Sequence, residues 1–136
     1  MTKPKRTLTD TNTILRYFLK DNKILYEKSN VFFEKVRLGE KKAVILESVL
    51  VECTYVLMKF YQVPKEEVTS KLIDLLHYKG IANSDKKELI DALKMFKEHK
   101  KDIVDCILWT KSLNYNMNIF SFDKHLKKCK NTMRNK

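Results

Sequence analysis

The stretch Thr7-Leu8-Thr9-Asp10-Thr11-Asn12-Thr13-Ile14 decides the fold that the sequence predicts. Its first residues are β-branched and half apolar, which is typical of a short strand. The strand ends at the acidic Asp10, and a helix is expected to begin near Thr13. An open α/β sheet places its functional side chains at the carboxyl ends of its strands. Asp10 is therefore the first candidate site residue.

Strand-like and helical segments alternate along the rest of the chain. Residues 43–46 form a continuous apolar run, as in a buried parallel strand. Residues 81–82 are a candidate for a very short strand, and residues 118–122 are expected to form the last one. Gly39 is expected to end a helix over residues 25–38 in the left-handed conformation. The alternation predicts an α/β fold with parallel strands joined by helical crossovers.

Length and composition bound the class of protein. The 136 residues are expected to form a single domain over residues 1–136, with a basic tail over about 124–136. No apolar run approaches the ~20 residues that a membrane span needs, so no membrane partner is expected. The three cysteines form no C-x-x-C pair, which argues against a disulfide framework or a zinc site. These features predict a protein of the reducing cytoplasm.

The net charge of +11 favours a polyanionic partner such as nucleic acid, although many lysine-rich chains are basic only for solubility. The charge gathers beside two acidic residues. Basic residues precede Asp10 and follow Asp123, after which no acidic residue occurs. The candidate RNA-binding residues after Asp123 are Lys124, Lys127, Lys128 and Lys130. The two interpretations, RNA binding and solubility, both stay open at this point.

Asp10 and Asp123 each follow a predicted strand. If the strands are parallel, both carboxylates lie at the same edge of the sheet. The competing interpretation of Asp10 is an N-cap for the helix that follows, but Asn12 could fill that role and leave Asp10 free. The competing interpretation of Asp123 is an ordinary turn aspartate.

Glu52 is expected to be buried. It lies three residues after Val49 and four before Val56, on the apolar stripe of a predicted helix. Glutamate is almost never fully buried unless it is paired or binds a metal. The alternative to a metal ligand is a buried salt bridge to a lysine.

Asp105 is the fourth candidate, inside the apolar run of residues 103–109. A helix that is apolar nearly all round is expected to pack on both sides. Asp102 is a good N-cap for this helix, and Asp105 three residues later is compatible with a capping role. We assign Asp102 to capping and Asp105 to the site.

Together, the four carboxylates predict a divalent metal site. Gathered carboxylates repel one another, which raises their pKa values, and a cation relieves the repulsion. Ligation by oxygen alone suits Mg²⁺ or Mn²⁺ rather than zinc. The three histidines have no ligand spacing, and the chain has no glycine-rich phosphate loop.

The ordered set of acidic motifs resembles the PIN-domain ribonucleases, specifically the VapC-type toxins of prokaryotic toxin–antitoxin pairs. The matching segments are residues 8–15, 49–57, 102–106 and 121–123, which cover nearly the whole chain in family order. The family's acidic positions fall on Asp10, Glu52, Asp105 and Asp123. Its supporting polar positions fall on Asn12, Thr11 and Ser121. The family's last short strand has no clear counterpart after Leu126.

The resemblance implies an α/β/α sandwich around a central parallel sheet of four or five short strands. It also implies a Mg²⁺- or Mn²⁺-dependent endoribonuclease that forms a homodimer and is inhibited by a cognate antitoxin protein. The alternatives are a non-catalytic PIN-like module that binds RNA or protein, and a metal-dependent DNA nuclease. Sequence does not separate RNA from DNA, because a metal-bound water needs no 2′-hydroxyl to attack a phosphodiester.

Overall fold

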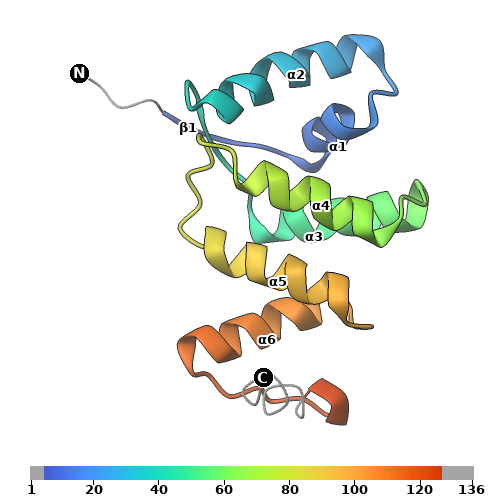
Figure 1. The fold of residues 1–136 in the computed structure, drawn as a ribbon, viewed down its shortest axis with the longest axis vertical. Coiled ribbons are helices and arrows are strands. Elements are labelled where there is room, and N and C mark those ends of the chain that lie inside the picture. The colour runs from blue at the N-terminus through green and yellow to red at the C-terminus, as the bar shows by residue number, and fades with distance from the viewer. Residues whose placement is uncertain (1–4, 127–136) are drawn as a thin grey trace. The chain divides into compact units, whose positions relative to one another are not determined.

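The structure, a computed structural model, describes residues 5–126 of the chain. The chain divides into two compact units, Met1–Lys86 and Lys87–Lys136. Figure 1 shows the elements of each unit in chain order. The prediction of one domain over residues 1–136 stays a prediction. Within residues 5–126, no helix is long and apolar enough to cross a membrane.

The first unit carries the strands and the larger share of the helices. Its elements are β1 (Arg6–Leu8), α1 (Thr11–Leu19), α2 (Lys23–Leu38), β2 (Lys42–Val44), α3 (Glu47–Tyr55), the π-helix η1 (Val56–Phe60) and α4 (Lys65–Leu76). The second unit contains α5 (Lys86–Glu98), whose first residue still belongs to the first unit, and α6 (Ile103–Tyr115).

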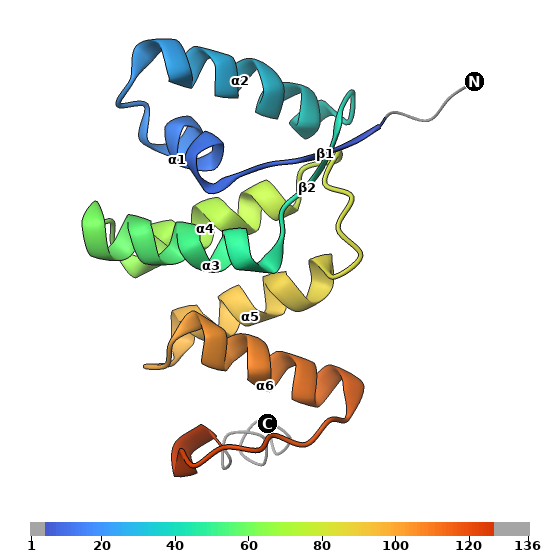
Figure 2. The same ribbon diagram turned by 180° about the vertical axis from the view of Figure 1, so that it is seen from behind.

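The strands β1 and β2 are parallel, as the sequence predicts. Thr7 lies opposite Ala43 in their register, and the two strands run side by side in Figure 2. Parallel neighbours need a crossover connection, which α1 and α2 supply. Ala43 also forms a parallel bridge to Ile81, which confirms strand-like pairing near residues 81–82. Two strands and this bridge are the pairings found in residues 5–126, so a sheet of four or five strands is not confirmed.

Residues 118–122, predicted as the last strand, are not a strand in the structure. Phe120 and Phe122 are 91% and 92% exposed, and their rings contact each other edge to face at 5.6 Å. An extended segment counts as a strand only when its backbone pairs with a neighbour. The apolar pattern alone therefore could not decide this element.

The core of the first unit forms where α1, α2 and α3 pack together. Ile14, Phe33, Val36 and Leu50 are completely buried. The ring of Tyr17 stacks on Phe33 with centroids 4.9 Å apart. Each large apolar side chain buried in this way contributes about 1.5–3 kcal/mol relative to the exposed state. This packing holds the first turns of α1 and α3 at defined positions.

Two glycines shape the backbone next to β2. Gly39 ends α2 with φ of 83°, which confirms the predicted left-handed cap. Gly80 donates its N–H to the carbonyl of Val36 at 2.7 Å, and its own carbonyl accepts from Ala43 N at 2.9 Å. A Cβ on residue 80 would lie 2.0 Å from the Lys41 carbonyl oxygen. The close approach of these backbones therefore requires glycine at position 80.

The Asn83 side chain extends the pairing at the carboxyl end of β2. Its Nδ2 donates to the Ile45 carbonyl at 2.6 Å, and its Oδ1 accepts from Ile45 N at 2.9 Å. The amide therefore satisfies both backbone groups of a buried residue just before α3 begins. This fixes the start of the helix that carries Glu52.

The helix α6 is buried on one side only, so the prediction that it packs on both sides is wrong. Val104 and Leu108 are 47% and 41% exposed, whereas Ile103 and Trp109 are buried. The Trp109 indole donates to the Leu126 carbonyl at 3.0 Å. The exposed pair lies four residues apart, on one face of the helix.

Candidate functional site

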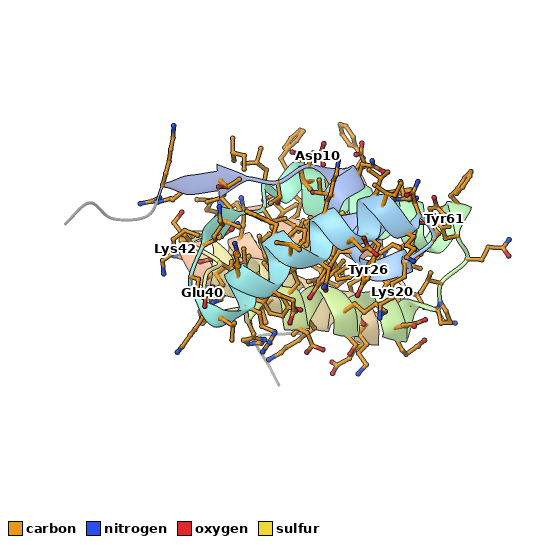
Figure 3. All side chains as sticks on the ribbon, turned by 90° about the horizontal axis from the view of Figure 1, so that it is seen from above. Asp10, Lys20, Tyr26, Glu40, Lys42 and Tyr61 are labelled. Atoms are coloured by element: carbon orange, nitrogen blue, oxygen red, sulfur yellow. The ribbon has the colours of Figure 1, made fainter. Side chains whose placement is uncertain are left out.

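Asp10 stands at the N-cap of α1, at the carboxyl end of β1 (Figure 3). Its Oδ1 accepts a hydrogen bond from Thr13 N at 3.0 Å, so the capping role belongs to Asp10 and not to Asn12. The helix begins at Thr11, two residues before the predicted start near Thr13. Asp10 is exposed, and its second carboxylate oxygen has no hydrogen bond to any residue in 5–126. Capping therefore leaves one oxygen available for a metal.

Glu52 is exposed on α3, so the prediction that it lies on the buried stripe is wrong. The residues that α3 buries are Leu50, Cys53 and Thr54. Leu57 in η1 continues this stripe at i+7 from Leu50. The stripe therefore runs beside Glu52 and not through it. The sequence pattern allowed two different faces of the helix to be the buried one, because Val49 and Val56 are also apolar.

Asp10 and Glu52 both influence the buried Cys53 in the core of the first unit. Burial raises the pKa of the Cys53 thiol to about 12, and the negative charges of Glu52 and Asp10 add to the rise. A hydrogen bond between the Thr11 and Cys53 side chains opposes it. Both carboxylates thus lie within electrostatic reach of one buried side chain. Thr11, a predicted supporting residue, forms a contact between α1 and α3.

Asp105 lies half-buried in the first turn of α6. Partial burial raises its pKa above the ordinary range, and the charges of Asp102 and Asp123 raise it further. The ammonium of Lys101 acts in the opposite direction. The second unit therefore brings Asp105 and Asp123 into one electrostatic neighbourhood.

Asp123 is exposed and organises a tight turn. Its Oδ1 accepts from the backbone N–H groups of His125 at 2.9 Å and Leu126 at 3.4 Å. The His125 hydrogen bond is the main reason that the pKa of Asp123 is lowered. The Ser121 hydroxyl accepts from Asp123 N at 3.0 Å, and Lys101 Nζ lies 3.8 Å from Asp123 Oδ2. Asp123 therefore stabilises a turn, and its Oδ2 faces the ammonium of Lys101.

Sequence reasoning missed Lys101 in this neighbourhood and gave Asp102 another role. Asp102 occupies the N-cap of α6 but forms no side-chain capping hydrogen bond, so its carboxylate is not used as predicted. The positive charge of Lys101 lowers the pKa values of both Asp105 and Asp123. The adjacent opposite charges at positions 101 and 102 were the only signal, and such pairs are common on surfaces.

Each unit by itself holds two of the four predicted ligands. Asp10 and Glu52 belong to the first unit, and Asp105 and Asp123 belong to the second. Within residues 5–126, no group of three or more histidine, cysteine, aspartate or glutamate side chains is arranged to hold a metal ion. The convergence of all four carboxylates stays a prediction.

The structure describes only some of the lysines that the sequence predicts to bind RNA. Lys124 is exposed, next to Asp123. Lys127, Lys128 and Lys130 lie outside the described residues. At the start of β1, Lys5 and Arg6 are exposed. These two residues add positive charge near the strand that leads to Asp10.

Comparison with known proteins gives one match. The PIN domain family matches residues 7–131, which is most of the chain and includes the four predicted ligands. No curated protein and no solved structure matches the chain.

Proposed function

The chain belongs to the PIN domain family, whose members are commonly metal-dependent nucleases, and from this premise we propose that it is a Mg²⁺- or Mn²⁺-dependent endoribonuclease. In this proposal it is the toxin of a type II toxin–antitoxin pair of the VapC type and hydrolyses RNA phosphodiester bonds. Its partners are an RNA substrate, a cognate antitoxin protein and a second copy of the chain. Its place of action is the cytoplasm.

One observation supports the proposal: in each unit, two of the four candidate ligands share one electrostatic neighbourhood. Asp10 and Glu52 both raise the pKa of the Cys53 thiol, and Asp123 raises the pKa of Asp105. Because carboxylates of like charge repel, a protein gains little by grouping them unless a cation balances the charge. The donor set of carboxylate oxygens fits Mg²⁺ or Mn²⁺.

Each side chain has a role that its contacts support. Asp10 offers its Oδ2 to a metal, while its Oδ1 accepts the hydrogen bond from Thr13 N at the start of α1. Thr11 interacts with Cys53 through a side-chain hydrogen bond, which links the first turn of α1 to α3. Ser121 shapes the backbone at Asp123 through its 3.0 Å hydrogen bond.

The second unit contributes Asp105 as a half-buried ligand with a raised pKa, which binding of a cation would lower. Lys101 balances the charge of Asp123, with Nζ 3.8 Å from Asp123 Oδ2. A bound divalent cation supplies an activated water and stabilises charge on the phosphodiester.

The positive charge supports a nucleic-acid substrate. With a net charge of +11, the protein attracts a polyanion over a distance of about one Debye length, ~8 Å at physiological salt. Lys5, Arg6 and Lys124 are exposed near the ends of the described chain and are available for backbone phosphates.

The test is cleavage of labelled RNA and of DNA of the same sequence, with Mg²⁺, with Mn²⁺ and with excess EDTA. We expect RNA cleavage that requires the metal and is lost in Asp10→Asn and Asp105→Asn. The matched controls are Glu40→Gln in the first unit and Asp91→Asn in the second, which should retain activity. Undiminished RNA cleavage in EDTA would refute the mechanism, and cleavage of DNA alone would refute the substrate. RNA binding without any cleavage would favour the non-catalytic module.

A further inference from the structure

A cavity of about 370 Å³ lies among α1, α2 and α4 of the first unit, and none of the four carboxylates lines it. Cavities that bind small organic ligands have volumes of about 300–1,000 Å³. The lining side chains come from three helices of one unit, so their mutual positions are set by that unit alone. Figure 3 labels two of them, Lys20 and Tyr26, which lie next to each other.

Two aromatic rings of the cavity each have a lysine above one face. Lys20 Nζ lies 5.5 Å from the centroid of Tyr26, and Lys71 Nζ lies 5.7 Å from that of Phe18. Neither ammonium forms a salt bridge with a carboxylate in residues 5–126. Both rings are only half-buried. The cavity therefore combines accessible aromatic faces with two ammonium groups that form no ion pair in the described part of the chain.

Two further side chains offer hydrogen-bonding groups. Asn30 Oδ1 accepts from the Tyr26 hydroxyl at 3.3 Å, which leaves the Asn30 amide N–H groups available. The Asp74 carboxylate is exposed and makes no hydrogen bond or ion pair within the described chain. An amide donor and a carboxylate acceptor that line the same cavity offer both groups that the mixed edge of a nucleobase needs.

Three other side chains that line the cavity, Tyr17, Glu34 and Tyr78, are joined by hydrogen bonds of the tyrosine hydroxyls. Tyr17 donates to Glu34 Oε2 at 3.0 Å, and the hydroxyls of Tyr17 and Tyr78 are 2.6 Å apart. Burial is the main reason that the pKa of Tyr17 is raised, so the phenol stays neutral. Arg37 pairs with Glu34 at 3.0 Å and balances its charge. Glu34 therefore adds little repulsion toward an anionic ligand.

The geometry points to this cavity as a nucleotide-binding site. The base stacks on the aromatic walls with its edge toward Asn30 and Asp74, and the phosphate binds Lys20 and Lys71. Stacking of a base on an aromatic ring is stronger than an exposed lysine–ring contact, so the base displaces each ammonium from the ring toward the phosphate. The nucleotide is either free or part of an RNA strand. In the second case the cavity anchors the substrate of the nuclease, and to that extent the inference rests on the proposed function.

Binding is measured in EDTA, so that cleavage cannot interfere. The probes are adenosine 5′-monophosphate, adenosine, and a fluorescein-labelled oligoadenylate of about ten nucleotides, near the length that single-strand sites cover. The variants are Tyr26→Leu, which removes the ring, Tyr26→Phe, which keeps it, and the double variant Lys20→Ala/Lys71→Ala. The controls are Phe60→Leu, a 75% exposed ring outside the cavity, and Lys59→Ala/Lys79→Ala.

We expect Tyr26→Leu to weaken nucleotide binding by about 5- to 150-fold, the range for loss of one stacked base. Tyr26→Phe and both controls should bind like wild type. The lysine double variant should reduce binding of the monophosphate toward that of adenosine. Tight binding of the monophosphate alone identifies a free nucleotide, and tight binding of the oligonucleotide with competition by the monophosphate identifies an RNA strand.

The inference is overturned if neither nucleotide binds, or if Tyr26→Leu loses no more affinity than Phe60→Leu. Its failure is separable from failure of the proposed function. Asp10→Asn should abolish cleavage and leave this binding unchanged. A protein that never cleaves RNA but loses nucleotide binding in Tyr26→Leu would keep the inference and refute the nuclease.

Discussion

Replacement of Asp105 by asparagine tests whether this carboxylate belongs to a metal site or only supports the start of α6. In the folded protein the pKa of Asp105 is raised, first by burial and then by Asp102 and Asp123. Stability linked to such a group is fully present below the unfolded pKa and is lost as pH rises through the folded pKa. At neutral pH the charged carboxylate therefore costs stability, and Asp105→Asn removes that cost.

The opposing effect is the loss of a negative charge at the N-terminal end of α6. An acidic residue in the first turn contributes about 0.3–1 kcal/mol through the helix dipole. Because the relief of desolvation and repulsion should match or exceed this loss, we expect metal-free stability to be unchanged or slightly higher. For a chain of this length, 1 kcal/mol corresponds to roughly 3–5 °C in Tm. The metal-free Tm of Asp105→Asn should therefore lie within a few degrees of wild type, or above it.

Manganese should separate the two proteins clearly. A ligand that binds only the folded state adds about 2.7 kcal/mol at a hundredfold excess over Kd, or roughly 10 °C. Wild type should show this rise in Tm, and Asp105→Asn should lose most of it together with RNA cleavage. The control is Asp91→Asn, on α5, whose ion pair with Lys87 is exposed and weak.

The assay is a set of melting curves of the three proteins, each with EDTA and with Mn²⁺. A drop of about 3–5 kcal/mol in metal-free stability would indicate that Asp105 is the partner of a buried cation. If wild type also showed no response to manganese, the placement of Asp105 in a metal site would be refuted.

Three further predictions follow from the structure and the sequence. Gly80→Ala should destabilise the first unit by at least about 1–3 kcal/mol in urea unfolding, because the new Cβ would lie 2.0 Å from the Lys41 carbonyl oxygen. The comparison is Gly39→Ala at the left-handed cap of α2, and a loss for Gly80→Ala no larger than for Gly39→Ala would contradict this. Asp123→Asn should lower Tm at pH 7 but little near pH 2, since the lowered pKa of Asp123 means that its stabilisation is lost as pH falls through that value; equal effects at both pH values would disprove the turn's dependence on charge. RNA binding should weaken steeply with salt, and replacing Lys127 and Lys128 with alanine should flatten the slope; an unchanged slope would mean that these lysines serve solubility.

Local chemistry made several elements predictable. The run around Asp10 reads as a strand followed by a capped helix, and the structure has both. Gly39 ends α2 because a left-handed position favours glycine. Parallel pairing of β1 with β2 followed from the alternation of strands and helices. The strand, the start of α1 and the end of α2 depend on residues within a few positions of one another, whereas the strand pairing joins distant residues such as Thr7 and Ala43.

The sequence by itself therefore determined the parallel pairing of the first two strands, the left-handed end of α2 and the family to which the chain belongs, because these depend on residue type and spacing along the chain. Only the tertiary structure decided that Glu52 is exposed and that residues 118–122 are unpaired. Apolar residues on both sides of Glu52 allowed two helix phases, and packing of Leu50 and Cys53 selected one. A strand forms only when its backbone pairs with another segment, which no local pattern supplies. Which face of a helix is buried depends on the surface that packs against it.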